Sequence, residues 1–255
     1  MTGHPMERRM DAFDIAILMP FARGSAAPFA TPFGQVSCEP WGTGGRAAVV
    51  LGPAPDPRAA PWAARALGAT RLVVAGAGAA LNRLLRPCDW VLPDDYVDQT
   101  RGLPTTYFAE RGLGYVQQTP PFCPEMREAL AGIPESRTSR VFERGTYVSL
   151  PSPRTETPAE AGWWRRLGGD VAGWGVLPAV TLAHELELCV APVCYLTREA
   201  AGEDETWLAP SDADTLLAAL LATLPVERHC HCGETMAGAR ARGHINVDWW
   251  QRMTP

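Results

Sequence analysis

Short apolar runs bounded by turn-forming residues recur along the chain, and they limit the possible folds more than any other feature. Runs rich in Val, Ile and Leu are typical of strands that are buried on both faces of a sheet. They predict strands at Asp14–Met19, Ala47–Leu51, Arg71–Ala75, Trp90–Leu92, Thr146–Leu150, Asp170–Trp174 and Cys189–Leu196.

Helical signals lie between several of these runs. The segment Thr157–Gly169 begins with Thr-Pro-x-Glu, which supplies an N-cap, a proline at the first helical position and a capping-box carboxylate, and it ends with two glycines. Further helices are predicted over Pro178–Leu188 and from Ser211, as N-cap, to Pro225. This alternation predicts a single α/β domain with a largely parallel or mixed central sheet.

Charge and the N-terminus narrow the class of protein. Lys plus Arg number 23 and Asp plus Glu number 28, so the net charge is −5, and nucleic acid is not expected as a partner. The apolar segment Ile15–Met19 stops at Pro20 and is too short for a signal peptide or a membrane span, which predicts a cytoplasmic protein. Seven cysteines, an odd number, indicate free thiols.

A glycine-rich stretch overlaps the third predicted strand. Arg71–Asn82 reads RLVVAGAGAALN, and a turn of this composition after a strand often binds phosphate through backbone N–H groups. The stretch contains no Lys, Ser or Thr. We therefore expect a loop whose contact with an anion would depend on the backbone.

Three blocks of sequence resemble the nucleoside phosphorylase family, in particular its methylthioadenosine, methylthioinosine and purine nucleoside phosphorylase branch. The blocks are Ala75–Thr100, Pro120–Leu130 together with Gly145–Trp164, and Gly168–Gly202. The resemblance implies an α/β fold with a mixed, barrel-like central sheet flanked by helices over residues 12–228. It also implies a homotrimer with the active site near a subunit interface, and cleavage of a purine nucleoside by phosphate. The tail 229–255 lies outside the match.

The resemblance maps the phosphate-contacting side chains of the family onto positions that here carry no polar side chain. These positions are Phe21, Gly52, Pro53, Gly76 and Gly175. Ala77 retains the alanine whose backbone contacts phosphate in the family. Charge-assisted hydrogen bonds contribute about 1.5–3 kcal/mol each, so their loss predicts weak phosphate binding and leaves hydrolysis by water as a variant.

The same resemblance places residues around the purine and the ribose. Glu156 matches a carboxylate on the base edge, although it could also be a solvated residue ahead of a helix, and Thr155 precedes it. Trp174 replaces a ribose-contacting Met, where it either stacks on a ligand or fills vacated space. Thr197 is retained, and Arg198 replaces the base-side Asp or Asn; it could stabilise a leaving anion but could not act as a general acid.

The tail contains a second candidate site. His229, Cys230, His231 and Cys232 are consecutive, and imidazole and thiolate are the preferred ligands of zinc or copper. The alternative is an exposed or subunit-buried tail segment without metal. The pair Trp249–Trp250 predicts that the tail docks on its own domain or on a neighbour.

Two functions remain open from the sequence. The first is an enzyme of the pentosyltransferase class that cleaves the N-glycosidic bond of a purine nucleoside or methylthio-nucleoside, with phosphate as co-substrate and no other cofactor. The second is a family member without catalysis that binds a small ligand or serves as a subunit, with a metal at its tail.

Overall fold

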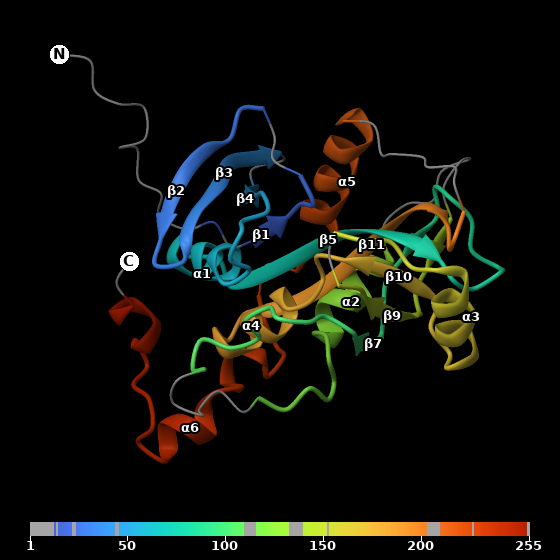
Figure 1. Ribbon diagram of the computed structural model, residues 1–255. Coiled ribbons are helices and arrows are strands. Elements are labelled where there is room, and N and C mark those ends of the chain that lie inside the picture. Colours follow the sequence, from blue (N-terminus) through green and yellow to red (C-terminus); the bar gives the residue numbers. More distant parts are fainter. Residues whose placement is uncertain are drawn as a thin grey trace.

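A computed structural model describes residues 13, 15–21, 24–43, 46–109, 116–132, 140–151, 153–202, 210–225 and 227–253. Within them, eleven strands form one mixed sheet with helices on both sides (Figure 1). The strands are β1 (Ile15–Leu18), β2 (Ala27–Thr31), β3 (Gly34–Thr43), β4 (Arg46–Leu51), β5 (Arg71–Ala80), β6 (Trp90–Val91), β7 (Asp95–Asp98), β8 (Val141–Phe142), β9 (Thr146–Ser149), β10 (Val171–Trp174) and β11 (Cys189–Glu199).

Strand β5 is the centre of the sheet. Its first half, Arg71–Val74, pairs with β1 in parallel, and its second half, Ala77–Ala80, pairs with β10 in antiparallel orientation. On its other side β11 runs parallel to it over its whole length. The strand order is β2-β3-β4-β1-β5-β10-β9-β7, with β11, β6 and β8 branching from β5. The predicted mixed sheet is confirmed, and over the described ranges it stays open.

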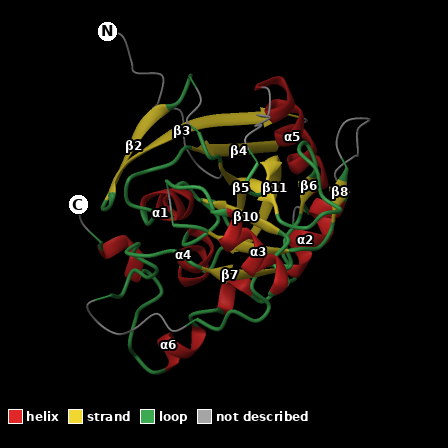
Figure 2. Ribbon diagram, turned by 45° about the vertical axis from the view of Figure 1, so that its right-hand side comes forward, coloured by secondary structure: helices red, strands yellow, loops and turns green. Residues whose placement is uncertain are grey.

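Helices cover both faces of this sheet (Figure 2). They are α1 (Ala59–Ala66), α2 (Pro124–Ala131), α3 (Pro158–Arg166), α4 (Ala179–Glu185), α5 (Pro210–Thr223) and α6 (Ala237–Ala241). Helices α1 and α4 pack with one core cluster, whereas α2 and α5 pack with another on the opposite face. Along β4, Val49 and Leu51 face the first cluster while Ala48 and Val50 face the second, as expected for a strand buried on both faces.

All the predicted strands are present, but β5 is longer than predicted. The glycine–alanine segment that we expected to form a loop is the second half of this strand, so the loop prediction is wrong. The small residues serve close packing: a Cβ atom on Gly78 would lie 2.6 Å from Cγ1 of Val171 on β10, and one on Gly173 would lie 2.5 Å from the carbonyl oxygen of Ala77. Asp14, at the start of the first predicted strand, lies outside the described residues.

The helix predictions are confirmed with small shifts. In α3 the Thr157 hydroxyl accepts a hydrogen bond from the Glu160 N–H, and the Glu160 carboxylate accepts one from the Thr157 N–H. Helix α5 already includes Pro210, so Ser211 lies within it rather than at its N-cap. No helix in the described parts of the chain combines the length and apolar character needed to cross a bilayer.

The tail docks on its own domain, one of the two outcomes predicted from its tryptophans. It comprises a 3-10 turn at Cys232–Glu234, α6 and a second 3-10 turn at Trp249–Arg252. The ring of Trp249 lies 4.4 Å from that of Phe108, centroid to centroid, and Nε1 of Trp62 donates to the Trp250 carbonyl.

Candidate active site

A cavity of about 310 Å³ lies at the carboxyl ends of β1, β4 and β10, beside the middle of β5. In open α/β sheets ligands bind in the crevice beyond these ends. The described residues that line it include Met19, Pro53, Ala75, Trp174, Gly175 and Leu177. None of them carries a formal charge, and Trp174 is the only one with a polar side-chain group. The cavity therefore suits an apolar or aromatic ligand surface.

The strand ends and the turns that follow them build this wall. The Met19 N–H donates to the Leu51 carbonyl, which extends the pairing of β1 with β4, and the Gly52 N–H donates to the Ser37 carbonyl. Gly175 turns the chain from β10 towards α4 with a φ of +98°, a conformation that favours glycine. An added Cβ atom there would meet no neighbour within 4 Å, so backbone conformation rather than space favours glycine.

The positions that the resemblance assigned to phosphate mostly gather at this cavity. Pro53 and Gly175 line it, Gly52 is buried next to Pro53, and Gly76 is buried next to the lining Ala75. A Cβ atom on Gly76 would lie 3.2 Å from Cγ2 of Val176. Phe21 is 39% exposed and is not part of the wall. Most of these positions therefore lie in or beside one cavity, whose lining presents apolar groups and backbone.

Trp174 forms part of the cavity wall instead of filling the space. The residue is half-buried at the end of β10, in register with Ala77 of β5, and the cavity beside it remains open. Of the two alternatives for Trp174, the structure supports a side chain that is available to contact a ligand.

Glu156 and Arg198 form a buried, bidentate ion pair. The guanidinium nitrogens of Arg198 lie 2.6 and 2.7 Å from the Glu156 carboxylate oxygens, and the Ala201 N–H donates to the same carboxylate at 2.8 Å. Side-chain exposure is 7% for Arg198 and 0% for Glu156. Burial alone would raise the pKa of Glu156, but the hydrogen bonds from Arg198 and Ala201 outweigh it and lower the pKa. The interpretation of Glu156 as a solvated residue is wrong.

This ion pair lies away from the cavity. Arg198 is in register with Ala79 of β5, four residues beyond the lining Ala75, or roughly 13 Å at 3.3 Å per residue. Thr197 is buried at a register shift of β11 and its hydroxyl lies 3.4 Å from the Gly78 carbonyl, while Thr155 is exposed. Glu156 and Arg198, which the resemblance assigned to the purine base, therefore bind each other and do not line the cavity.

A second buried carboxylate was missed by the sequence analysis. Glu185 of α4 accepts hydrogen bonds from the Thr106 hydroxyl and, at 2.7 Å, from the Tyr107 N–H. Burial raises its pKa to about 7. The neighbouring His184 is also buried, with Nε2 at 3.0 Å from the Pro121 carbonyl oxygen, and burial lowers its pKa. An acidic residue within an otherwise apolar helical segment is the signal that could have revealed Glu185.

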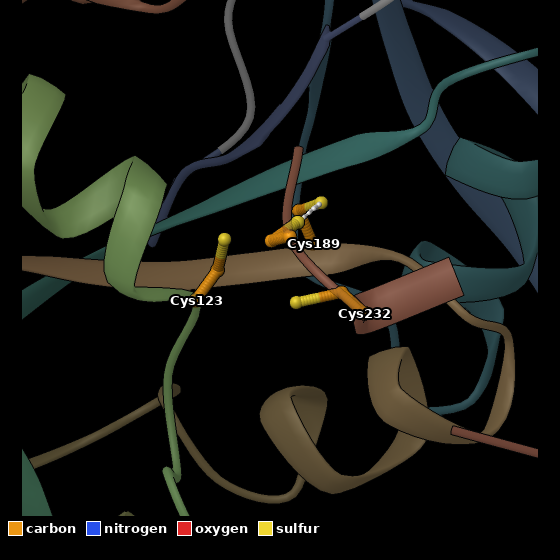
Figure 3. Close-up of side chains that lie close together, drawn as sticks. Cys123, Cys189 and Cys232 are labelled. Atoms are coloured by element: carbon orange, nitrogen blue, oxygen red, sulfur yellow. Dashed lines mark hydrogen bonds between the residues drawn. The ribbon is translucent and has the colours of Figure 1, made fainter. Parts of the chain in front are cut away.

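The tail residues proposed as metal ligands separate in the structure. His229 is exposed, and the side chain of His231 is 92% exposed with Nδ1 at 3.5 Å from a Glu234 carboxylate oxygen. The two tail cysteines instead meet two cysteines of the domain (Figure 3). The set is Cys123, Cys189, Cys230 and Cys232. The candidate ligand set therefore loses both imidazoles and gains two thiols.

Comparison with known proteins places this geometry in context. The family model described as "Phosphorylase superfamily" matches residues 36–228. A protein of Methanopyrus kandleri named "Probable S-methyl-5'-thioinosine phosphorylase" is 37% identical over 194 residues, which cover 71% of this chain and 75% of that protein. The "6-oxopurine nucleoside phosphorylase" of Pyrococcus furiosus is 34% identical over 200 residues, covering 71% and 76% of the two chains.

Solved structures agree in fold. A methylthioadenosine phosphorylase from an antarctic soil metagenomic library has a TM-score of 0.75 at 22% identity, covering 88% of this chain and 91% of that one. A double mutant of the Schistosoma mansoni adenosine/methylthioadenosine phosphorylase, in complex with adenine, has a TM-score of 0.74 at 20% identity and covers 90% and 97%.

Proposed function

Because the chain belongs to the phosphorylase superfamily, we propose that it cleaves the N-glycosidic bond of a purine nucleoside, with 5′-methylthio-nucleosides as the favoured substrates. The relatives in Methanopyrus kandleri and Pyrococcus furiosus carry the names of methylthioinosine and 6-oxopurine nucleoside phosphorylases. Those names favour an enzyme over a ligand-binding subunit without catalysis.

The observation that carries the proposal is the apolar cavity at the carboxyl ends of β1, β4 and β10, beside the middle of β5. It lies mainly within the matched residues 36–228, and its volume of about 310 Å³ is in the range of small-molecule sites. Its apolar wall would accept a methylthio group more readily than a charged or strongly hydrated substituent, because a polar group buried without a partner is costly.

Trp174 supplies the electrostatic part of the mechanism. Positive charge develops on the ribosyl ring as the bond to the base breaks, and catalysis requires groups that bind this charge more tightly in the transition state. The face of an indole attracts a cation, and more strongly where water is excluded. Trp174 in the cavity wall is the described residue best suited to this role.

Water is the nucleophile that this lining favours. A phosphate dianion would have to give up its hydration, and the described lining residues offer no Arg, Lys or hydroxyl in exchange. A water molecule needs only a few hydrogen-bond partners, which backbone groups at the strand ends can provide. We therefore expect hydrolysis to free base and sugar, with phosphate adding little.

A panel of nucleosides tests both parts of the proposal. Purified protein would be incubated with methylthioadenosine, methylthioinosine, inosine, guanosine and adenosine, with and without phosphate, and the free base measured by chromatography. We expect base release from at least one methylthio-nucleoside at similar rates in both buffers. Release that strictly requires phosphate would contradict the choice of water, and release from no member would contradict glycosidic cleavage.

The proposal extends to the oligomeric state of the protein and to its cellular compartment. We propose a homotrimer in the cytoplasm, supported by the resemblance to the nucleoside phosphorylase family. Light scattering coupled to gel filtration measures the mass of the particle, and a monomer at micromolar concentration would contradict the trimer.

A further inference from the structure

Four cysteine side chains from distant parts of the chain meet where the tail joins the domain. Cys123 is the N-cap of α2, Cys189 is the first residue of β11, and Cys230 and Cys232 belong to the tail. Their Sγ atoms all lie within 4.8 Å of one another, and those of Cys189 and Cys230 lie 3.3 Å apart. In Figure 3 the labelled members, Cys123, Cys189 and Cys232, approach one another from three separate segments.

The geometry points to one zinc ion bound by these four thiolates, in a structural site that fastens the tail to the domain. Zinc binds four cysteines tetrahedrally with Zn–S distances of about 2.3 Å, which gives sulfur–sulfur separations of about 3.8 Å. The 3.3 Å contact and the 4.8 Å upper limit bracket this value, so small side-chain rotations would complete the tetrahedron. Four protein ligands leave no open position, which is typical of structural rather than catalytic zinc.

The donor set selects the metal. Soft thiolate ligands in a tetrahedral arrangement suit zinc or an iron–sulfur cluster, whereas the hard cations magnesium and calcium prefer oxygen. Cys123 and Cys189 are buried, and Cys230 and Cys232 are half-buried, so the site is largely shielded from solvent. A compact group of four sulfurs suits a single ion better than a cluster, which needs space for several irons and sulfides between its ligands.

Binding must be balanced in protons and charge. Each of the four thiols gives up a proton to solvent as its sulfur bonds to Zn²⁺, and the resulting group carries two net negative charges. Nη1 of Arg228 lies 3.9 Å from Sγ of Cys189, so a cation stands beside the group. The backbone N–H of Met126, in the first turn of α2, donates to the sulfur of Cys123.

The tail segment is held in position for this binding. The backbone N–H groups of His229 and Cys230 both donate to the carboxylate of Glu125, in the first turn of α2. The backbone N–H of Cys232 donates to the sulfur of Cys230, a contact that fits the close spacing of a Cys-x-Cys chelate. The Glu125 carboxylate also accepts a hydrogen bond from the Cys230 thiol, and this bond is given up when the thiol releases its proton to bind the metal.

Zinc would add a covalent-type link among three segments that already contact one another through hydrogen bonds, such as that from the Cys123 N–H to the Val190 carbonyl. Beyond Cys232, the Thr235 hydroxyl donates to the His184 carbonyl, and Arg240 pairs with Glu187 at 2.6 Å. A metal ion that joins α2, β11 and the tail adds its binding free energy to folding, because the unfolded chain does not hold the four ligands together. Loss of the metal is therefore expected to release the tail first.

Metal analysis of the whole protein tests the site. Protein purified under reducing conditions without chelator would be measured by inductively coupled plasma mass spectrometry. We expect about one zinc ion per chain in the wild type and in the control Cys38→Ala, whose buried cysteine lies outside the group, and less than about a tenth of that in the double variant Cys230→Ser/Cys232→Ser. The double variant changes only the tail, so circular dichroism should still report a folded domain.

A second readout keeps the test independent of variant folding. Cobalt exchanged into the wild-type protein should give the intense visible bands of a tetrahedral cobalt–thiolate site, and chelation should make the tail sensitive to protease before the domain. A metal-free protein whose intact mass shows disulfides among these cysteines would overturn the proposal. Iron and sulfide in place of zinc, or equal zinc in the double variant, would overturn it as well.

Discussion

The middle and the C-terminal end of strand β5 differ in the charges that border them. Beside Ala75 the strand borders an apolar cavity whose described lining residues carry no charge, and beside Ala79 it pairs with the segment of β11 that holds Arg198 against Glu156. The resemblance assigns both regions to one bound nucleoside and its phosphate. It places phosphate and sugar in the region beside Ala75, and the base in the region beside Ala79. The middle of β5 borders an open cavity with no charged lining residue, whereas its C-terminal end borders a buried ion pair whose two charges bind each other.

This difference in charge indicates which of the two regions can bind a ligand. A buried carboxylate that already accepts hydrogen bonds from Arg198 and from the Ala201 N–H has little capacity left for a purine. An apolar cavity gains free energy from any apolar surface that enters it, at about 25 cal/mol per Å². Ligand binding is thus expected at the cavity, and the ion pair is expected to stabilise the contact between β11 and the segment that precedes α3.

Removing the arginine should have the largest effect. Arg198→Met leaves the Glu156 carboxylate buried with backbone N–H groups, those of Ala201 and of Glu156 itself, in place of a cation, and breaking a buried pair in this way costs about 3–5 kcal/mol. Urea denaturation would measure the loss. The double variant Arg198→Met/Glu156→Gln, which removes both charges, should recover much of it. A decrease of less than about 1 kcal/mol in the free energy of unfolding would mean that water reaches this ion pair.

The second buried carboxylate tests the same reasoning without a cation. Burial raises the pKa of Glu185 from 4.5 to about 7, and none of the ion pairs in the described ranges includes it. Its contribution to stability is therefore fully present below pH 4.5 and is lost as the pH rises to about 7. Relative to wild type, Glu185→Gln should gain up to about 3 kcal/mol between pH 4.5 and 8.

Thermal unfolding of both proteins across this pH range measures the effect. The matched control is Glu128→Gln on the exposed face of α2, for which the difference from wild type should not vary in the same way. A constant difference between Glu185→Gln and wild type would contradict a raised pKa for Glu185.

The sequence predicts the strands and helices of this fold better than it predicts which of them pack against one another. Strands such as β1 and β11 are buried on both faces, so burial alone requires an apolar run that can be recognised. Strands β2 and β3 alternate between exposed and buried residues and contain proline, and they were missed. The second half of β5 was taken for a loop because its glycines signal a turn, whereas the close approach of β10 is what requires them.

The candidate sites depend still more on contacts between distant segments. Glu156 and Arg198 are 42 residues apart, and each was assigned separately to the base of a ligand when in fact they bind each other. The four cysteines come from three segments, and only the Cys-x-Cys of the tail is visible as a motif. In contrast, Pro53, Trp174 and Gly175, which the resemblance assigned to phosphate and ribose, all line one cavity.

At the cavity end, the expected effect is on turnover. Trp174→Ala removes the aromatic face from the wall, so kcat/KM for a methylthio-nucleoside should fall at least about tenfold, or roughly 1.4 kcal/mol in transition-state free energy. Trp163→Ala, with a side chain that is 47% exposed on α3, is the matched control and should leave kcat/KM unchanged. Equal turnover by the two variants would remove Trp174 from the mechanism.

The smallest effect is expected at a surface pair that repeats the chemistry of the buried one. Arg154 contacts the Glu160 carboxylate in a bidentate arrangement at 2.8 and 2.6 Å, almost the geometry of Arg198 and Glu156. Its side chain is 49% exposed and that of Glu160 is 30% exposed, however, so water and salt screen their attraction. Arg154→Ala should therefore leave the urea midpoint of unfolding nearly unchanged. A small decrease in the midpoint is expected only at low salt, where the attraction is screened less. If Arg154→Ala instead destabilised the protein as much as Arg198→Met, bond geometry rather than burial would determine the strength of these ion pairs. The contrast between the middle of β5, with its uncharged cavity, and the C-terminal end, with its buried ion pair, would then need another cause.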